Sequence, residues 1–129
     1  MLKTTIAESP KGKIILMDSI TKLAPGDEGS VVLSASHGGA SSGEFALVMP
    51  LKLVLFNDAG IGRDNAGIAA LDMLDEHGVG GATISHISGR IGDARDMWDN
   101  GIISAVNKLA SYLGLGVGDK VSQKLLTLV

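Results

Sequence analysis

The sequence of 129 residues contains no cysteine. Disulfide bonds, cysteine nucleophiles and thiolate-bound metal centres are therefore excluded. Aromatic residues make up only 3%, so the hydrophobic core has to be built from Val, Ile, Leu, Ala and Met. Long hydrophobic runs are also missing: the longest, residues 45–51, is interrupted by Pro50 and is far too short to cross a bilayer.

A cluster of basic residues is lacking as well. The 11 Lys and Arg residues are scattered and the net charge is −3, so the chain has no electrostatic footprint for nucleic acid. The first residues do not contain the apolar core of a signal peptide. We therefore expect a soluble, cytoplasmic protein that binds neither nucleic acid nor membranes.

Apolar residues and glycine are abundant instead. Apolar residues reach 45% and the mean hydropathy is +0.30, which argues against disorder. The length is typical of one domain, so we expect a single α/β domain over residues 1–129. High apolarity in so small a chain also predicts a homo-oligomer. The 18 glycines indicate tight turns or places where the backbone approaches a ligand.

Apolar runs alternate with helical patterns along the chain. The runs 13–17, 30–35, 51–56 and 82–84 predict strands, and 51–56 is apolar on both pleat faces apart from Lys52, as in a parallel strand covered on both sides. Helices are predicted over 42–49, where Ser41 and Glu44 match a capping box, and over 66–77, 93–113 and 119–128. The connections are too long for hairpins. Together with right-handed crossovers, they predict a three-layer sandwich with a mainly parallel sheet of about four or five strands and helices on both faces.

Polar, glycine-rich loops follow three of the predicted strands. The carboxyl ends of parallel strands meet at one edge of the sheet, and ligands bind in the crevice outside that edge. We therefore expect one shared site with three walls. Its candidate residues are Ser36, His37, Gly38 and Gly39 in the first loop, Asn57, Asp58, Gly60, Gly62 and Arg63 in the second, and Ser85, His86, Arg90, Asp93 and Arg95 in the third.

These loops favour an anionic ligand. The glycines of the first two loops can bring backbone N–H groups close to an anion, and the arginines of the second and third loops can bind carboxylate or phosphate through paired hydrogen bonds. The glycine spacing matches neither the dinucleotide fingerprint nor the ending of a phosphate-binding loop. We predict a small metabolite that carries carboxylate or phosphate. The other interpretation of the glycines is a tight strand-to-helix turn.

His37 and His86 each follow a serine at the end of a predicted strand. As a general acid or base, either would be oriented by Asp58 or Asp93, which predicts lyase, isomerase or hydrolase chemistry without a cofactor. One alternative is a divalent metal held by the two histidines and an aspartate. Others are a Ser36 nucleophile with His86 as its base, and purely structural histidines. A non-catalytic anion-binding or regulatory subunit would use the same site.

Overall fold

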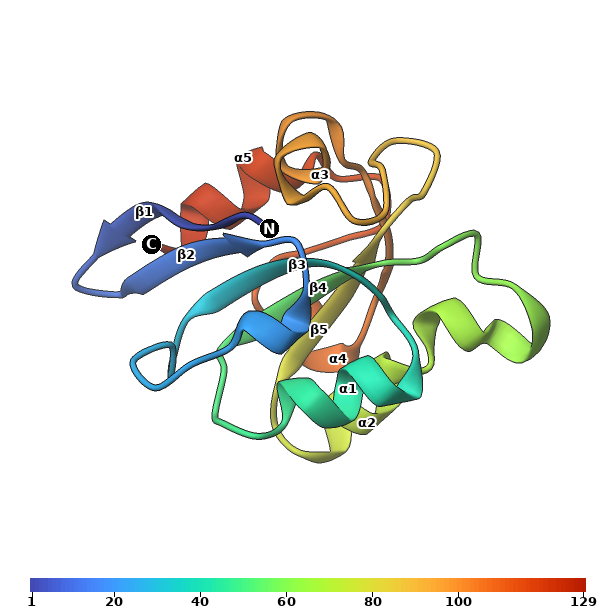
Figure 1. Cartoon of the computed structure of the whole chain (residues 1–129), viewed down its shortest axis with the longest axis horizontal. Coiled ribbons are helices and arrows are strands. Elements are labelled where there is room, and N and C mark those ends of the chain that lie inside the picture. The colour runs from blue at the N-terminus through green and yellow to red at the C-terminus, as the bar shows by residue number, and fades with distance from the viewer.

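The computed structural model describes all 129 residues except for the side chain of Arg63. Six strands form one sheet in chain order. Figure 1 labels β1 to β5. The strands are β1 (Lys3–Ser9), β2 (Gly12–Met17), β3 (Val31–His37), β4 (Leu53–Asn57), β5 (Gly80–Ile84) and β6 (Ile103–Val106). Strands β2 to β5 are parallel, whereas β1 and β6 run antiparallel to their neighbours at the two edges. The expected sheet of four or five strands is therefore corrected to six, because β6 lies where a helix was predicted.

Short helical segments connect the strands and complete the chain. They are η1 (Ile20–Lys22), α1 (Ala40–Ala46), η2 (Arg63–Ile68), α2 (Ala70–Glu76), α3 (Ala94–Asn100), α4 (Lys108–Tyr112), α5 (Val121–Leu125) and η3 (Leu126–Leu128). In Figure 1, α3 and α5 lie on one side of the sheet, and α1 and α2 lie on the other. No helix in the described chain has the length and apolarity needed to span a membrane.

Hydrophobic side chains form two clusters, because successive side chains of a strand point to opposite faces of the sheet. On β4, Leu53 and Leu55 belong to the cluster that includes α3 and α5, whereas Val54 and Phe56 belong to the cluster that includes α1 and α2. All four side chains are 0% exposed. The structure thus confirms that the apolar run 51–56 contains a parallel strand buried on both sides.

The single helix predicted over 93–113 is wrong, because this region contains α3, β6 and α4. Helix α3 ends at Gly101, which has extended backbone angles and donates its N–H to the Met97 carbonyl. A side chain at position 101 would collide with that same carbonyl oxygen. The chain then extends to pair antiparallel with β5, for example Thr83 with Ala105. The helical spacing of apolar residues across this region came from separate elements.

The predicted capping box at the start of α1 is also wrong. The helix begins one residue before Ser41, and its N-cap is Gly39, which has no side chain to accept a hydrogen bond. Helix α1 ends at Ala46, ahead of Pro50, as the sequence predicts for a proline that stops a helix.

Asn107 joins α4 to β5 and α2. Its side chain is buried, and its Oδ1 accepts hydrogen bonds from Gly81 N (3.0 Å) and Ala110 N (2.9 Å). Its Nδ2 donates to the carbonyls of Leu71 (3.1 Å) and Val79 (3.0 Å). The amide group therefore caps α4 and hydrogen-bonds to the backbone of β5, of α2 and of the residue before β5.

We predict that Asn107→Ala lowers the free energy of unfolding by about 3 kcal/mol or more, because it leaves buried donors and acceptors without partners. Chemical denaturation measures this loss. The matched control is Asn100→Ala, since Asn100 is exposed and makes one side-chain hydrogen bond, to Asp96. The control is expected to cost less than about 1 kcal/mol. Equal losses in the two variants would contradict the role assigned to Asn107.

Candidate functional site

Asp58, which directly follows β4, connects the loops that follow β4 and β5. Its side chain is buried, and one carboxylate oxygen, Oδ1, accepts three hydrogen bonds. The donors are Gly60 N (2.8 Å), His86 N (3.1 Å) and the His86 ring at Nδ1 (3.2 Å). The predicted pairing of Asp58 with a histidine is therefore present, and that histidine is His86.

The pKa of Asp58 lies below the usual value of an aspartate. Burial alone would raise this pKa, but hydrogen bonds from Gly60, Ser104 and both donors of His86 outweigh burial. Asp58 is thus a carboxylate at neutral pH and can only accept hydrogen bonds. Nδ1 of His86 must then carry the proton of their shared hydrogen bond, which leaves Nε2 to exchange a proton with a ligand.

Ser104 on β6 extends this network and was not predicted from the sequence. Its hydroxyl helps to lower the pKa of Asp58, and it also forms a 2.9 Å hydrogen bond with the Thr83 hydroxyl. No sequence pattern pointed to Ser104, because a helix was predicted where β6 lies.

The chain after Asp58 makes an unusual left-handed turn. Positive φ angles occur at Ala59 (49°), Gly60 (81°), Ile61 (65°) and Gly62 (74°). Such angles are strained for a non-glycine residue, above all for β-branched isoleucine. At the end of the loop, a side chain at position 67, which is a glycine, would collide with the Asp58 carbonyl oxygen. The glycines of this loop therefore serve the tight turn, which was the alternative interpretation.

The anion cradle predicted from glycine N–H groups is not available at three of its four positions. Gly38 N donates to the Asn57 carbonyl (2.9 Å), Gly60 N to Asp58, and Gly62 N to the Gly60 carbonyl (2.7 Å). These groups are used to build the loops, because a sharp turn has to pair its own backbone. Gly39 is the N-cap of α1 and lies against the His37 ring instead.

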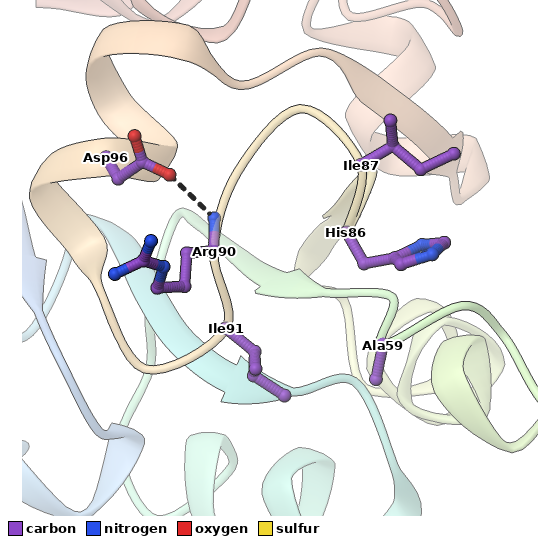
Figure 2. Close-up of a pocket in the computed structure, with 6 residues that line it drawn as sticks. All are labelled: Ala59, His86, Ile87, Arg90, Ile91 and Asp96. Carbon is purple, nitrogen blue, oxygen red and sulfur yellow. Dashed lines mark hydrogen bonds between the residues drawn. The ribbon is translucent and has the colours of Figure 1, made fainter.

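A hollow of about 470 Å³ opens beside His86 (Figure 2). The His86 side chain is 48% exposed, so solvent and ligands can reach it. In Figure 2, His86 and Ala59 lie on one side of the hollow, Arg90 lies on the other, and Ile91 lies between them. The hollow is lined by Ala59, His86, Ile87, Arg90, Ile91 and Asp96.

Asp96 fixes the position of the Arg90 backbone, and the charge of the nearby Arg90 guanidinium also helps to lower the pKa of Asp96. Asp96 Oδ2 accepts a hydrogen bond from Arg90 N at 2.8 Å, the dashed line in Figure 2. This bond and one from Asn100 lower the pKa of Asp96, so it remains a carboxylate at neutral pH. Among the described side chains, no carboxylate forms an ion pair with the Arg90 guanidinium. The exposed guanidinium can therefore bind an anion.

His37 does not share the hollow of His86. It lines a separate hollow of about 290 Å³ at the start of α1, together with Gly39, Ala40, Ser41, Ser42, Ala66 and Ala69. The expected single site with three walls is thus corrected to two hollows at the same edge of the sheet. His86, Asp58 and Arg90 belong to one of them, and His37 belongs to the other.

The side chains of Asn57 and Ser85 hydrogen-bond to the loops that surround the hollow. The buried Asn57 side chain donates to the Gly89 carbonyl (2.8 Å) and accepts from Ala59 N (2.8 Å). The Ser85 hydroxyl accepts from Ile87 N at 3.2 Å. Both side chains are therefore engaged with the loops, and they position the hollow rather than bind in it.

Three other predicted side chains also lie outside the hollow of His86. The Ser36 hydroxyl accepts from Ile20 N (2.9 Å), which does not favour a nucleophile. Asp93 caps α3 by accepting from the N–H of residue 96 (3.0 Å) and does not contact a histidine as expected. Arg95 is exposed on α3 and does not line the hollow. The side chain of Arg63 lies outside the described part of the structure.

The described residues contain no group of three or more histidine and acidic side chains that could hold a metal ion. The predicted metal set of two histidines and an aspartate is thus not assembled among them, because His37 lies in a different hollow.

No protein-family model, curated protein or solved structure matches this chain.

We predict that Asp58→Asn lowers the free energy of unfolding by about 1–2 kcal/mol at pH 7, because the amide loses the charge that strengthens three hydrogen bonds. The folded-state pKa of Asp58 is lowered, so its contribution is present above the unfolded pKa of about 3.9 and is lost as the pH falls through the folded pKa. The difference between wild type and variant should therefore shrink from about pH 5 downward.

Urea denaturation at several pH values measures this difference. The exposed Asp99 offers a control, and Asp99→Asn is expected to change stability by less than about 0.5 kcal/mol throughout. A difference for Asp58→Asn that stayed constant down to pH 3 would show that its charge does not stabilise the two loops.

Proposed function

We propose that this protein is a small cytoplasmic enzyme that acts on an anionic metabolite by acid–base chemistry of the lyase, isomerase or hydrolase type. The observation that carries the proposal is the contact between Asp58 and His86. A buried carboxylate orients a ring that is 48% exposed beside an arginine-lined hollow. Buried carboxylates paired with accessible histidines are typical of sites where protons are transferred.

In the proposed mechanism, His86 transfers the proton and Asp58 orients it. Asp58 accepts from Nδ1, so neutral His86 presents the lone pair of Nε2 as a general base. After it takes a proton, the imidazolium is stabilised by the adjacent carboxylate and can return the proton to the product. Asp58 keeps its charge throughout, since its pKa is lowered.

Arg90 is the proposed anion-binding group. Its guanidinium has no ion-pair partner among the described side chains, and it lines the same hollow as His86. A guanidinium can bind both oxygens of a carboxylate through parallel hydrogen bonds. This contact would hold the substrate on one side of the hollow and present its reacting carbon to the imidazole.

A second candidate is a binding or regulatory subunit that holds the anion without chemistry. The observation in its favour is that Asp96, the other titratable acid in the hollow, has a lowered pKa and is not a proton donor at neutral pH. One histidine would then have to serve as both acid and base. Product analysis separates the two functions, since ligand binding raises the melting temperature whether or not turnover occurs.

The proposal includes two features of the molecule as a whole. One is a three-layer arrangement, supported by hydrophobic clusters formed with helices on both faces of the sheet. The other is a homo-oligomer, supported by the 45% of apolar residues and by exposed hydrophobic side chains such as Tyr112 and Val48.

We predict that His86→Gln lowers kcat by about 10²- to 10⁴-fold on a carboxylate that is first identified by thermal stabilisation and then by its product. The ligand should still stabilise the variant, because Arg90 is unchanged. His77→Gln is the matched control, since the His77 ring contacts the Met73 carbonyl at the end of α2 and lies outside the hollow.

His37→Gln tests whether one hollow is sufficient. Full turnover is expected, because His37 lines the other hollow. A loss as large as that of His86→Gln would show that the chemistry needs both hollows. Full turnover in His86→Gln would refute the proposed mechanism.

A further inference from the structure

Two isoleucines on the walls of the His86 hollow are exposed to solvent. Ile87 is 85% exposed and Ile91 is 48% exposed, although complete burial of such a side chain is worth about 1.5–3 kcal/mol. Single exposed apolar residues are common on protein surfaces, but these two line the same hollow as a histidine and an arginine. Their arrangement offers apolar contact area to a ligand rather than to the core.

The isoleucines are held on ordered turns. Ile87 donates its N–H to the Ser85 hydroxyl, and the turn that contains it is anchored where Asn57 donates to the Gly89 carbonyl. The turn after Ile91 is anchored where Gly92 N donates to the Ala35 carbonyl on β3 (2.9 Å). A ligand would therefore meet apolar walls that are already in place, which lowers the entropy cost of binding.

The charges around the hollow favour a ligand with one negative charge over a ligand with two. Arg90 supplies one positive charge, while the carboxylate of Asp96 lines the same wall and that of Asp58 lies behind His86. A phosphate dianion would be repelled by both carboxylates. It would also need several backbone N–H donors, and those of the turn after Asp58 are already paired. One guanidinium is sufficient for a carboxylate.

The shape of the hollow adds a requirement for an apolar middle segment. Figure 2 shows the Arg90 guanidinium turned away from the imidazole, with Ile91 lying between the two residues. Ile91 lines the same hollow as Arg90 and His86, so a ligand that contacts both of them can also contact Ile91. Polar groups at this point of the ligand would lose water without gaining a partner.

We propose that the His86 hollow binds small monocarboxylates that carry an apolar chain, with the carboxylate on Arg90 and the chain on Ile87 and Ile91. This inference names the ligand class of the site in the proposed function and rests on that site being used. It concerns binding alone, so it holds whether the protein is an enzyme or a binding subunit.

A series of acetate, butyrate and hexanoate tests the proposal, with inorganic phosphate and hexan-1-ol as comparison probes. Dissociation constants come from NMR titrations that follow the Ile87 and Ile91 methyl groups. Affinity is expected to rise about two- to fourfold for each added methylene that is buried. Hexanoate should bind more tightly than hexan-1-ol and phosphate. Arg90→Gln should weaken every carboxylate by a similar factor and leave the dependence on chain length intact.

The double variant Ile87→Ser with Ile91→Ser should remove the dependence on chain length. Val117→Ser with Leu126→Ser is the matched control, because these residues are 69% and 51% exposed and line no part of this hollow, and the dependence should remain. Affinity that does not change with chain length, or the same dependence in the isoleucine variant, would overturn the proposal. So would a wild-type dimer that the isoleucine variant turns into a monomer, since a second copy would then cover these side chains.

The binding series and the turnover assay fail independently. If the affinity of the wild-type protein rises with chain length but no product forms, the enzyme is rejected and the ligand class is retained. Turnover of a phosphate ester or of a polar acid, together with no dependence on chain length, would retain the acid–base function and reject the ligand class.

Discussion

The site depends on one buried oxygen atom, Oδ1 of Asp58, that accepts three hydrogen bonds from two different loops. A carboxylate that is 4% exposed is costly to bury unless donors surround it, so both loops have to approach this atom. The loop after β4 does so by a left-handed turn that isoleucine and alanine accept only under strain. The loop after β5 does so by bringing both the backbone and the ring of His86 to the carboxylate. One ionised group thus accounts for the strained turn and for the orientation of the accessible imidazole.

The strands in the middle of the sheet were predictable because burial on two faces leaves a direct record in the sequence. Residues 53–56 have no polar position to offer to solvent, and all four are fully buried. Strand β6 left no such record. It is four residues long, mostly half-buried, and follows a helix whose apolar positions happen to continue in helical register. The conformation of β6 is decided by its pairing with β5, a contact distant in the sequence. Local periodicity therefore could not reveal β6, and Ser104 was missed for the same reason.

The order of elements places both histidines at the same edge of the sheet, but it does not show that they line two different hollows. His37 and His86 both follow parallel strands at the same edge, which is all that the order of elements determines. After β3 the chain turns toward α1, in the hydrophobic cluster on one face, whereas after β5 it turns toward α3, in the cluster on the other face. His37 and His86 occupy equivalent places at the ends of their strands, but they therefore lie toward different faces of the sheet. The glycines were ambiguous for a related reason, since the sequence does not show whether an N–H group is already paired within its own turn.

This change of direction also explains why the hollow opens where it does. The chain leaves both β3 and β4 toward the cluster of α1 and α2, and it leaves β5 toward the cluster of α3. Neighbouring loops that leave a sheet in opposite directions open a crevice between them, which is the general reason why ligands bind at such points in α/β sheets. Here that point lies between β4 and β5, where Asp58 reaches His86 across the gap. The topology creates the opening, and the hydrogen bonds of the Asp58 carboxylate join its two walls, so the hollow is formed without a ligand.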